Sequence, residues 1–276
     1  MASGGRQAPA RAAARRAGAA PAARACSRGR GADGAACGMR ALATGLALLA
    51  LWQAVVSLSG APPYILPGPA AVLRALADNR GMLARNGLAT LAEILLGLGL
   101  GLLIGLAAGL ATALSTQVER LLRPLLVLSQ AVPVFALAPI LTLWLGYGMG
   151  SKVAVVVLIT FFPVASALHD GLRATPEAAL DLARLARAPR WRTLVWLRLP
   201  HALPHLAAAL RIAAVYAPIG AVIGEWVGSS AGLGHLMLLA NARMKTDLMF
   251  AALAVLAAMT LGLRAATDRG LRRLGL

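Results

Sequence analysis

Charged side chains are scarce in this chain. Only 13% of its 276 residues are Asp, Glu, Lys or Arg, whereas about a quarter is usual in a soluble domain, and 59% are hydrophobic. The mean hydropathy of +0.74 argues against a soluble domain and for a protein of the lipid bilayer. Cysteine is scarce too: the two present, Cys26 and Cys37, exclude a disulfide framework and a four-cysteine metal site. No metal site and no enzyme activity are expected.

Acidic residues are also few, 10 against 27 Lys and Arg, and the formal net charge is +17. Such an excess is typical of nucleic-acid-binding proteins. Here, however, the basic residues lie almost wholly between the apolar runs, where membrane topology requires them. We therefore expect no nucleic-acid partner.

The chain divides near residue 40. Residues 1–40 are mainly Ala, Gly and Arg, and such a segment has too little apolar surface to fold. It is expected to be a disordered tail or upstream sequence that is not translated. Residues 41–276 hold the apolar runs and are expected to form one transmembrane domain, with a cytoplasmic loop at 171–205.

Six apolar runs approach the length of about 20 residues that crosses a bilayer core. The clearest is the charge-free run of 25 residues between Glu93 and Glu119, whose Gly and Ala residues suit close packing of helices in lipid. A short amphipathic surface helix with a turn is expected at 70–86. The predicted spans are 41–59, 94–118, 124–151, 153–169, 206–226 and 248–263. The predicted fold class is all-α, a polytopic membrane bundle of about six helices, with five as the alternative count.

The basic residues predict the orientation. With the N-terminus inside, the inside segments 1–40, 111–123, 170–205 and 264–276 hold 8, 2, 6 and 4 basic residues. The outside segments 60–87, 146–152 and 227–247 hold only 3, 1 and 2. Because cytoplasmic loops carry the excess of Lys and Arg, both termini are expected in the cytoplasm.

The longest inside loop, 171–205, is expected to hold two short helices. Thr175 is the predicted N-cap of the first helix and Pro189 is expected to end it. Pro200 and Pro204 are expected to break the chain before the fifth span. Helical spacing gives the first helix one apolar stripe. On spacing alone, this helix is either an interfacial connector or a knob gripped by a soluble partner.

The same loop resembles the cytoplasmic signature of ABC-importer permeases: Glu-Ala-Ala, three residues, Gly, nine residues, then Ile-x-Leu-Pro. Aligned on Leu199-Pro200, Leu197 takes the Ile position, Arg187 the Gly position and residues 181–183 the Glu-Ala-Ala position. The literal Glu-Ala-Ala at 177–179 is four residues out of register. Arg187 departs from the signature where Gly would permit a sharp turn.

Other segments resemble the same family in the same order, among them Leu66-Pro67-Gly68-Pro69, Pro133, Ala138-Pro139, Leu210-Arg211-Ile212 and Gly232-Leu233-Gly234. The resemblance implies an inner-membrane permease subunit of a binding-protein-dependent ABC importer, with the type I permease fold, in a bacterial cytoplasmic membrane. The branch implied is that for taurine, alkanesulfonates, nitrate and pyrimidine compounds. The stretch GEWVGSS at 224–230 looks most like permeases for hydroxymethylpyrimidine precursors of thiamine.

The resemblance also implies partners: a cytoplasmic ABC ATPase, an extracytoplasmic solute-binding protein, a second copy of the chain and membrane lipid. Because the chain has no G-x-x-x-x-G-K-[ST] phosphate-binding loop, a separate subunit is expected to hydrolyse ATP, and this chain is expected to bind no cofactor. The residues implied in coupling to the ATPase are Asp181, Leu182, Ala183, Arg184, Arg187, Leu197, Leu199 and Pro200.

Ionisable residues near the spans are candidates for the solute pathway, because a charge in a membrane is costly and usually functional. Glu225 is either a gate residue, partnered by a helix N-terminus or an arginine, or a solvated residue at the outer end of the fifth span. Arg211, the only basic residue predicted inside a span, is expected to snorkel to the interface. The pathway candidates are Glu225, Glu93, Trp144, Tyr216 and Asn241, although Trp144 fits an interfacial aromatic belt equally well.

The sequence therefore predicts a permease that moves a small organic solute by alternating access, with a pyrimidine thiamine precursor as the first choice. Sulfonate, taurine and nitrate are alternatives within the same family. From other classes, an ion-coupled secondary transporter and a membrane-bound enzyme are alternatives, but the inverted repeats of the former and the clustered polar residues of the latter are not found.

Overall fold

The computed structural model describes residues 32–276, and the chain falls into two units, 1–60 and 61–276. The first unit contains one described helix, α2 (Ala32–Ser59), which includes the predicted first span. Residues 1–31 of the predicted tail lie outside the described residues. Residues 32–40 are the first turns of α2, so this helix begins before the boundary expected at residue 40.

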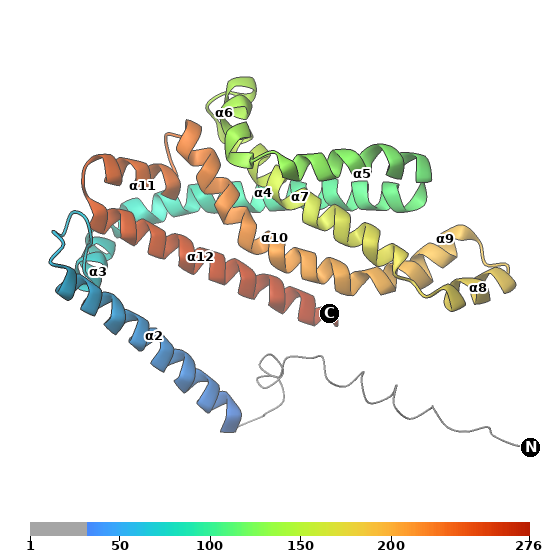
Figure 1. The fold of residues 1–276 in the computed structure, drawn as a ribbon, viewed down its shortest axis with the longest axis horizontal. Coiled ribbons are helices and arrows are strands. Elements are labelled where there is room, and N and C mark those ends of the chain that lie inside the picture. Colours follow the sequence, from blue (N-terminus) through green and yellow to red (C-terminus); the bar gives the residue numbers. More distant parts are fainter. Residues whose placement is uncertain (1–31) are drawn as a thin grey trace, which may run out of the picture. The chain divides into compact units, whose positions relative to one another are not determined.

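The second unit is built from helices, and no strand occurs in residues 32–276, which confirms the all-α fold class. Its elements are α3 (Pro69–Asp78), α4 (Arg80–Leu114), α5 (Thr116–Ala131), α6 (Val134–Leu145), α7 (Met149–Arg173), α8 (Glu177–Leu185), α9 (Arg190–Arg192), the π-helix η2 (Thr193–Arg198), α10 (Leu199–Gly228), α11 (Leu233–Ala242) and α12 (Thr246–Arg273). The long helices run along the unit, with α8 and α9 at one end and α3 and α11 at the other (Figure 1). These are called the α8 end and the α11 end below.

Four helical segments of the described chain are long and apolar enough to cross a membrane: α4, α7, the continuous stretch Arg190–Gly228, and α12. Shorter apolar helices are Ala43–Ser59, α6 and α11. The predicted third span is two helices, α5 and α6, instead of one. Pro133 disfavours the helical conformation of the residue before it, and Val132 is extended, with φ −85° and ψ 122°.

The predicted surface helix at 70–86 also differs from the structure. Its first part is α3, which ends at Asp78, whereas residues 80–86 are the first turns of α4. Asn79, with φ −106° and ψ 18°, separates the two helices. The second predicted span therefore begins well before the charge-free run that identified it.

Proline acts differently from the prediction in the loop 171–205. Thr175 is not an N-cap: it is buried, its hydroxyl donates to the carbonyl of Leu172, and Pro176 occupies the cap position. Pro200 and Pro204 do not break the chain, because η2 and α10 continue through them. Pro200 lies in the first turn of α10, where its missing N–H is tolerated. The N–H of Leu199 reaches back to the carbonyl of Leu194, so a wider turn precedes the proline.

Small residues let the long helices approach closely. The glycines of α4 recur every fourth residue at positions 97, 101, 105 and 109, and all four are buried. A Cβ atom added at Gly105 would lie 2.7 Å from the carbonyl oxygen of Phe161, and one at Gly109 would lie 2.7 Å from that of Ala165. This face of α4 therefore packs on the backbone of α7, as expected for helices associating in lipid.

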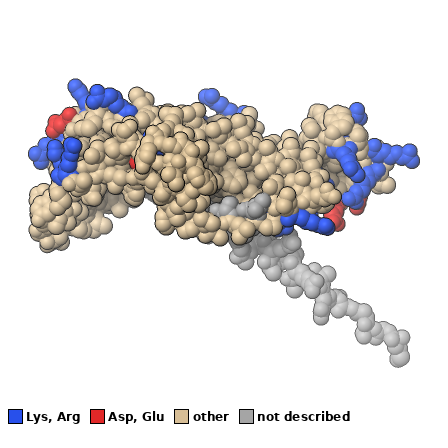
Figure 2. Space-filling model, turned by 90° about the horizontal axis from the view of Figure 1, so that it is seen from above, with Lys and Arg blue, Asp and Glu red and all other residues tan. Residues whose placement is uncertain are grey.

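Charge is distributed as a membrane-spanning body requires. Figure 2 shows one face of the molecule, on which most Lys and Arg side chains gather toward the two ends and the broad middle is largely uncharged. Large apolar side chains remain exposed along the long helices, such as Leu103 at 64% and Leu261 at 71%. Lipid tails, rather than water, suit such a surface.

Candidate functional site

The first candidate site is α8, at the α8 end of the unit. It follows the extended residue Pro176 and carries Glu177 in its first turn and Arg184 in its last, which suits the helix dipole. It buries no residue. Leu182 is 68% exposed and Leu185 is 82% exposed. An amphipathic helix whose leucines are uncovered is a surface suited to docking.

A sharp turn ends α8 at the position where the ABC-permease signature has Gly. The N–H of Ala188 donates to the carbonyl of Ala183 and that of Arg187 donates to Arg184, each at 2.9 Å. These two hydrogen bonds form a Schellman motif. Arg187 occupies its left-handed position, with φ +49°. The turn is therefore kept although a side chain replaces the glycine.

The two halves of the predicted coupling signature lie together. Leu197 belongs to η2, which contacts α8, and Leu199-Pro200 opens α10 directly after it. A cavity of about 740 Å³ lies between α8, η2 and the turn from α4 to α5, and Ala183 and Arg184 line it. Asp181 is exposed and accepts a hydrogen bond from Arg184 at 2.7 Å. The fold thus brings the predicted coupling residues to one end of the unit.

The second candidate site is a buried polar cluster near α11. Glu225 of α10 is 1% exposed, so the solvated position considered for it is wrong. One carboxylate oxygen accepts the hydroxyl of Thr90 at 2.6 Å, and the other accepts the N–H of Gly234 at 2.5 Å. The cost of burying the carboxylate is offset because it accepts one of the free N–H groups that begin a helix.

All three N–H groups that open α11 have side-chain acceptors from other helices. The N–H of Leu233 donates to the hydroxyl of Thr90, and that of Gly232 donates to the side-chain oxygen of Asn86, both at 2.8 Å. Gly232 has φ +117°, and a Cβ atom there would overlap the carboxyl group of Glu225. The start of α11 is thereby fixed to α4 and α10.

Glu93 lies one turn after Thr90 on α4 and is 1% exposed. One of its oxygens accepts a hydrogen bond from the ammonium group of Lys152 on α7 at 2.9 Å, and the side chain of Lys152 is 9% exposed. The other oxygen, Oε2, has no hydrogen-bond partner among the described residues. Lys152, placed by the sequence in an outside loop, is thus a buried member of α7, so Arg211 is not the only basic residue within a span.

Arg211 also differs from the prediction, because it is paired. Its Nε donates to the carboxylate of Asp268 on α12 at 2.8 Å. Arg264 donates to the same carboxylate at 3.0 Å and to the carbonyl of Arg211 at 3.2 Å. Two arginines around one carboxylate tie α10 to α12, so snorkelling to lipid headgroups is not what holds Arg211.

The structure brings together only two of the five pathway candidates, Glu93 and Glu225. The side chains of Trp144, Tyr216 and Asn241 are exposed, and among the described residues no hydrogen bond joins them to the cluster. Sequence reasoning missed Thr90 and Lys152, the side-chain partners of the two carboxylates, and Asn86, which accepts the N–H of Gly232. The signal available was the spacing of Asn86, Thr90 and Glu93, which places three polar side chains on one face of α4.

Comparison with known proteins identifies the family. Residues 97–275 match the model of the binding-protein-dependent transport system inner membrane component. A probable ABC transporter permease protein of Haemophilus influenzae is 53% identical over 226 residues, which are 82% of this chain and 92% of that protein.

Two further relatives are named as permeases for particular solutes. The riboflavin transport system permease protein of Chloroflexus aurantiacus is 45% identical, covering 78% of this chain and 81% of that one. The formylaminopyrimidine transport permease protein of Halalkalibacterium halodurans is 39% identical, covering 69% and 76%.

A solved protein structure has the same fold. An inward-facing structure of the MetNI methionine ABC transporter superposes with a TM-score of 0.62 at 20% identity, covering 71% of this chain and 97% of that one. The sequence matches favour a permease over the ion-coupled secondary transporter and the membrane enzyme considered as alternatives. The chain belongs to the family of binding-protein-dependent transport system inner membrane components, the permease subunits of ABC transporters.

Proposed function

We propose that this chain imports a small organic solute and couples to its ATPase through α8. The observation that carries this proposal is the uncovered apolar face of α8 beside the second half of the coupling signature in η2. A separate cytoplasmic subunit would hydrolyse ATP, and an extracytoplasmic protein would deliver the solute. Motion of α8 would pass through η2 into α10, because the helix is continuous from Arg190 to Gly228.

The α8 end is proposed to face the cytoplasm of a bacterial cell, with both termini on that side. Its support is the excess of arginine at that end. A homodimer is also proposed, since this chain holds one copy of the coupling signature and the family's machine needs two permease subunits. In that assembly, alternating access would come from rocking of the long helices.

The proposed solute is a small nitrogen heterocycle, with a pyrimidine precursor of thiamine as the first choice. Its support is the 39% identity to the formylaminopyrimidine permease. Riboflavin is the second candidate, because the riboflavin permease is 45% identical and covers more of the chain. Lys152 and Arg211 lie within spanning helices and are each paired with a carboxylate, which favours an uncharged solute over sulfonate, taurine or nitrate.

Uptake of labelled solutes tests this proposal. Cells that carry the complete importer should accumulate labelled aminopyrimidine precursor, and deletion of residues 40–276 should abolish that uptake. Loss of riboflavin uptake alone would assign the second candidate. Loss of taurine or nitrate uptake with pyrimidine uptake unchanged would overturn the heterocycle proposal and leave the family intact.

A further inference from the structure

A second cavity at the α8 end, of about 760 Å³, lies between the first half of α5 and the end of α7. It shares only Thr116 with the cavity between α8, η2 and the turn from α4 to α5. Its lining residues are Thr116, Glu119, Arg120, Arg123, Pro124, Leu128 and Arg173. Three arginines against one carboxylate make the lining positive.

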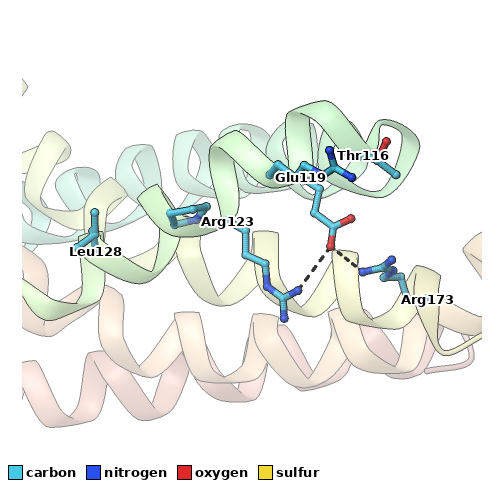
Figure 3. A pocket seen from close by; sticks show the side chains of 7 residues that line it. Thr116, Glu119, Arg123, Leu128 and Arg173 are labelled. Carbon is cyan, nitrogen blue, oxygen red and sulfur yellow. Dashed lines mark hydrogen bonds and ion pairs between the residues drawn. The ribbon is translucent and has the colours of Figure 1, made fainter.

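The single acid of this cavity faces inward. The side chain of Glu119 is 14% exposed, and its Oε1 lies 2.6 Å from Arg173, 3.6 Å from Arg123 and 3.5 Å from Nε2 of His169. In Figure 3, Arg123 and Arg173 converge on this carboxylate from two helices. The two arginines remain open to an outside ligand, with side chains 66% and 56% exposed. The more exposed charges of the cavity are therefore positive, and the half-buried charge that orients them is negative.

The rest of the lining is Thr116, Pro124 and Leu128, so away from the charged groups it is mainly apolar. Leu128 is 59% exposed and lies roughly 13 Å along α5 from Glu119, at 1.5 Å per residue. A ligand that fits this arrangement has a negative head and an apolar tail. Basic pockets between helices on the cytoplasmic side of a membrane bind anionic lipid headgroups in this way.

We propose that the cavity of Arg120, Arg123 and Arg173 binds an anionic phospholipid, with its phosphate on the arginines and an acyl chain along Leu128. The proposal rests on the orientation given under the proposed function, which puts this cavity at the cytoplasmic interface. Bound lipid would hold α5 against α7 together with Glu119. The shared chemistry is a phosphate group, and free phosphate is the other source that the test must separate.

The test uses the full chain in phosphatidylcholine vesicles that contain a spin-labelled phosphatidylglycerol. The wild type should retain an immobilised phosphatidylglycerol fraction, and the double variant R120Q/R123Q should bind it roughly 25-fold more weakly, about fivefold for each arginine. The matched control R74Q/R80Q, at exposed arginines of the α11 end, should bind as the wild type does. If the double variant does not fold, R120Q alone serves, because Arg120 makes no ion pair among the described residues.

Equal retention of the labelled lipid by wild type and R120Q would overturn the proposal. A wild type that shows no preference for phosphatidylglycerol would also overturn it, and this is the result expected if a second copy of the chain covers the cavity. Displacement of the label by inorganic phosphate would assign the site to a free anion and also overturn it. Lipid retention does not measure transport, so its failure leaves the proposed solute untouched, and failure of the uptake assay leaves the lipid site untouched.

Discussion

Glu225 gives both of its carboxylate oxygens to hydrogen bonds inside the protein, one from Thr90 and one from the start of α11. Glu93, one turn from Thr90, gives one oxygen to Lys152. At the scale of single residues, these carboxylates fasten helices to one another. Removing one member of a buried pair is costly, because it leaves the other without compensation.

Replacement of Glu225 separates a capping role from a role of its charge. E225A should lower the free energy of unfolding by about 1–3 kcal/mol, since it leaves the N–H of Gly234 without its acceptor. E225Q should lose less, because the amide oxygen still accepts that N–H and the amide nitrogen can donate to Thr90. Thermal unfolding in detergent checks both, with exposed Glu177→Gln as the control. A stable E225Q that no longer transports would show that the charge itself is needed.

Arg187 holds a left-handed conformation that costs a side chain roughly 1–2 kcal/mol. R187G should relieve that strain and slow hydrogen exchange of the amides at 187 and 188, which close the turn after α8. R187A removes the long side chain but keeps the strained backbone, so exchange should stay at the wild-type rate. Faster exchange in R187G would mean that the arginine side chain itself stabilises the turn.

At the scale of elements, two contacts decide how the unit is built. The glycine face of α4 lies directly on α7, and α8 stands outside the bundle against η2. The first contact is close, because a Cβ atom added at Gly97, Gly101, Gly105 or Gly109 would overlap α7. The second leaves α8 with no buried residue, which suits the coupling role proposed for it.

Two glycines of α4 form a matched pair. G105A would place a Cβ atom 2.7 Å from the carbonyl oxygen of Phe161, so α4 and α7 would have to separate, at a cost of about 1–3 kcal/mol. At Gly99 no atom outside the neighbouring turns of α4 lies within 4 Å of an added Cβ, so G99A should be neutral or slightly stabilising. Thermal unfolding of the two variants measures the difference. Equal stability would show that α4 and α7 do not pack as described.

The register of the coupling signature is tested on α8. A183E should uncouple ATP hydrolysis from transport, because Ala183 takes the last Glu-Ala-Ala position and lines the cavity between α8 and η2. A179E, four residues earlier, should do less. The ratio of ATP hydrolysed to solute moved is measured in vesicles with the complete importer. A larger effect at Ala179 would place the signature at the literal Glu-Ala-Ala instead.

At the scale of the whole molecule, charge and apolar surface determine how the chain lies in a membrane. The exposed surface of the long helices is apolar, and Lys and Arg gather toward the ends (Figure 2). The α8 end carries a cluster of arginines at 184, 187, 190, 192 and 198, which supports the cytoplasmic position proposed for it. The orientation follows from counting charges at the ends and not from any single residue.

Cysteine labelling checks this orientation. After replacement of Cys26 and Cys37 by serine, L182C should react with a membrane-impermeant maleimide only in inside-out vesicles, since Leu182 lies at the α8 end. R243C, at the exposed end of α11, should react only from outside intact spheroplasts. The reverse pattern would invert the topology.

The sequence by itself determined the all-α membrane fold and the family. These depend on the apolar runs and on short spacings along the chain, which are local. It also indicated Glu93 and Glu225 as unusual, because an acidic residue beside an apolar run is visible without a structure.

Only the tertiary structure decided what those residues do. Asn86, Thr90, Lys152 and Glu225 come from three helices, and Gly234 from a fourth, so their hydrogen bonds depend on packing distances that no spacing encodes. The split of the third span at Val132 and the continuity of the helix through Pro200 and Pro204 were likewise not predicted. A proline restricts the backbone dihedral angles of itself and of the residue before it. Whether a helix ends there depends on whether the surrounding structure can compensate for the hydrogen bond that the proline removes.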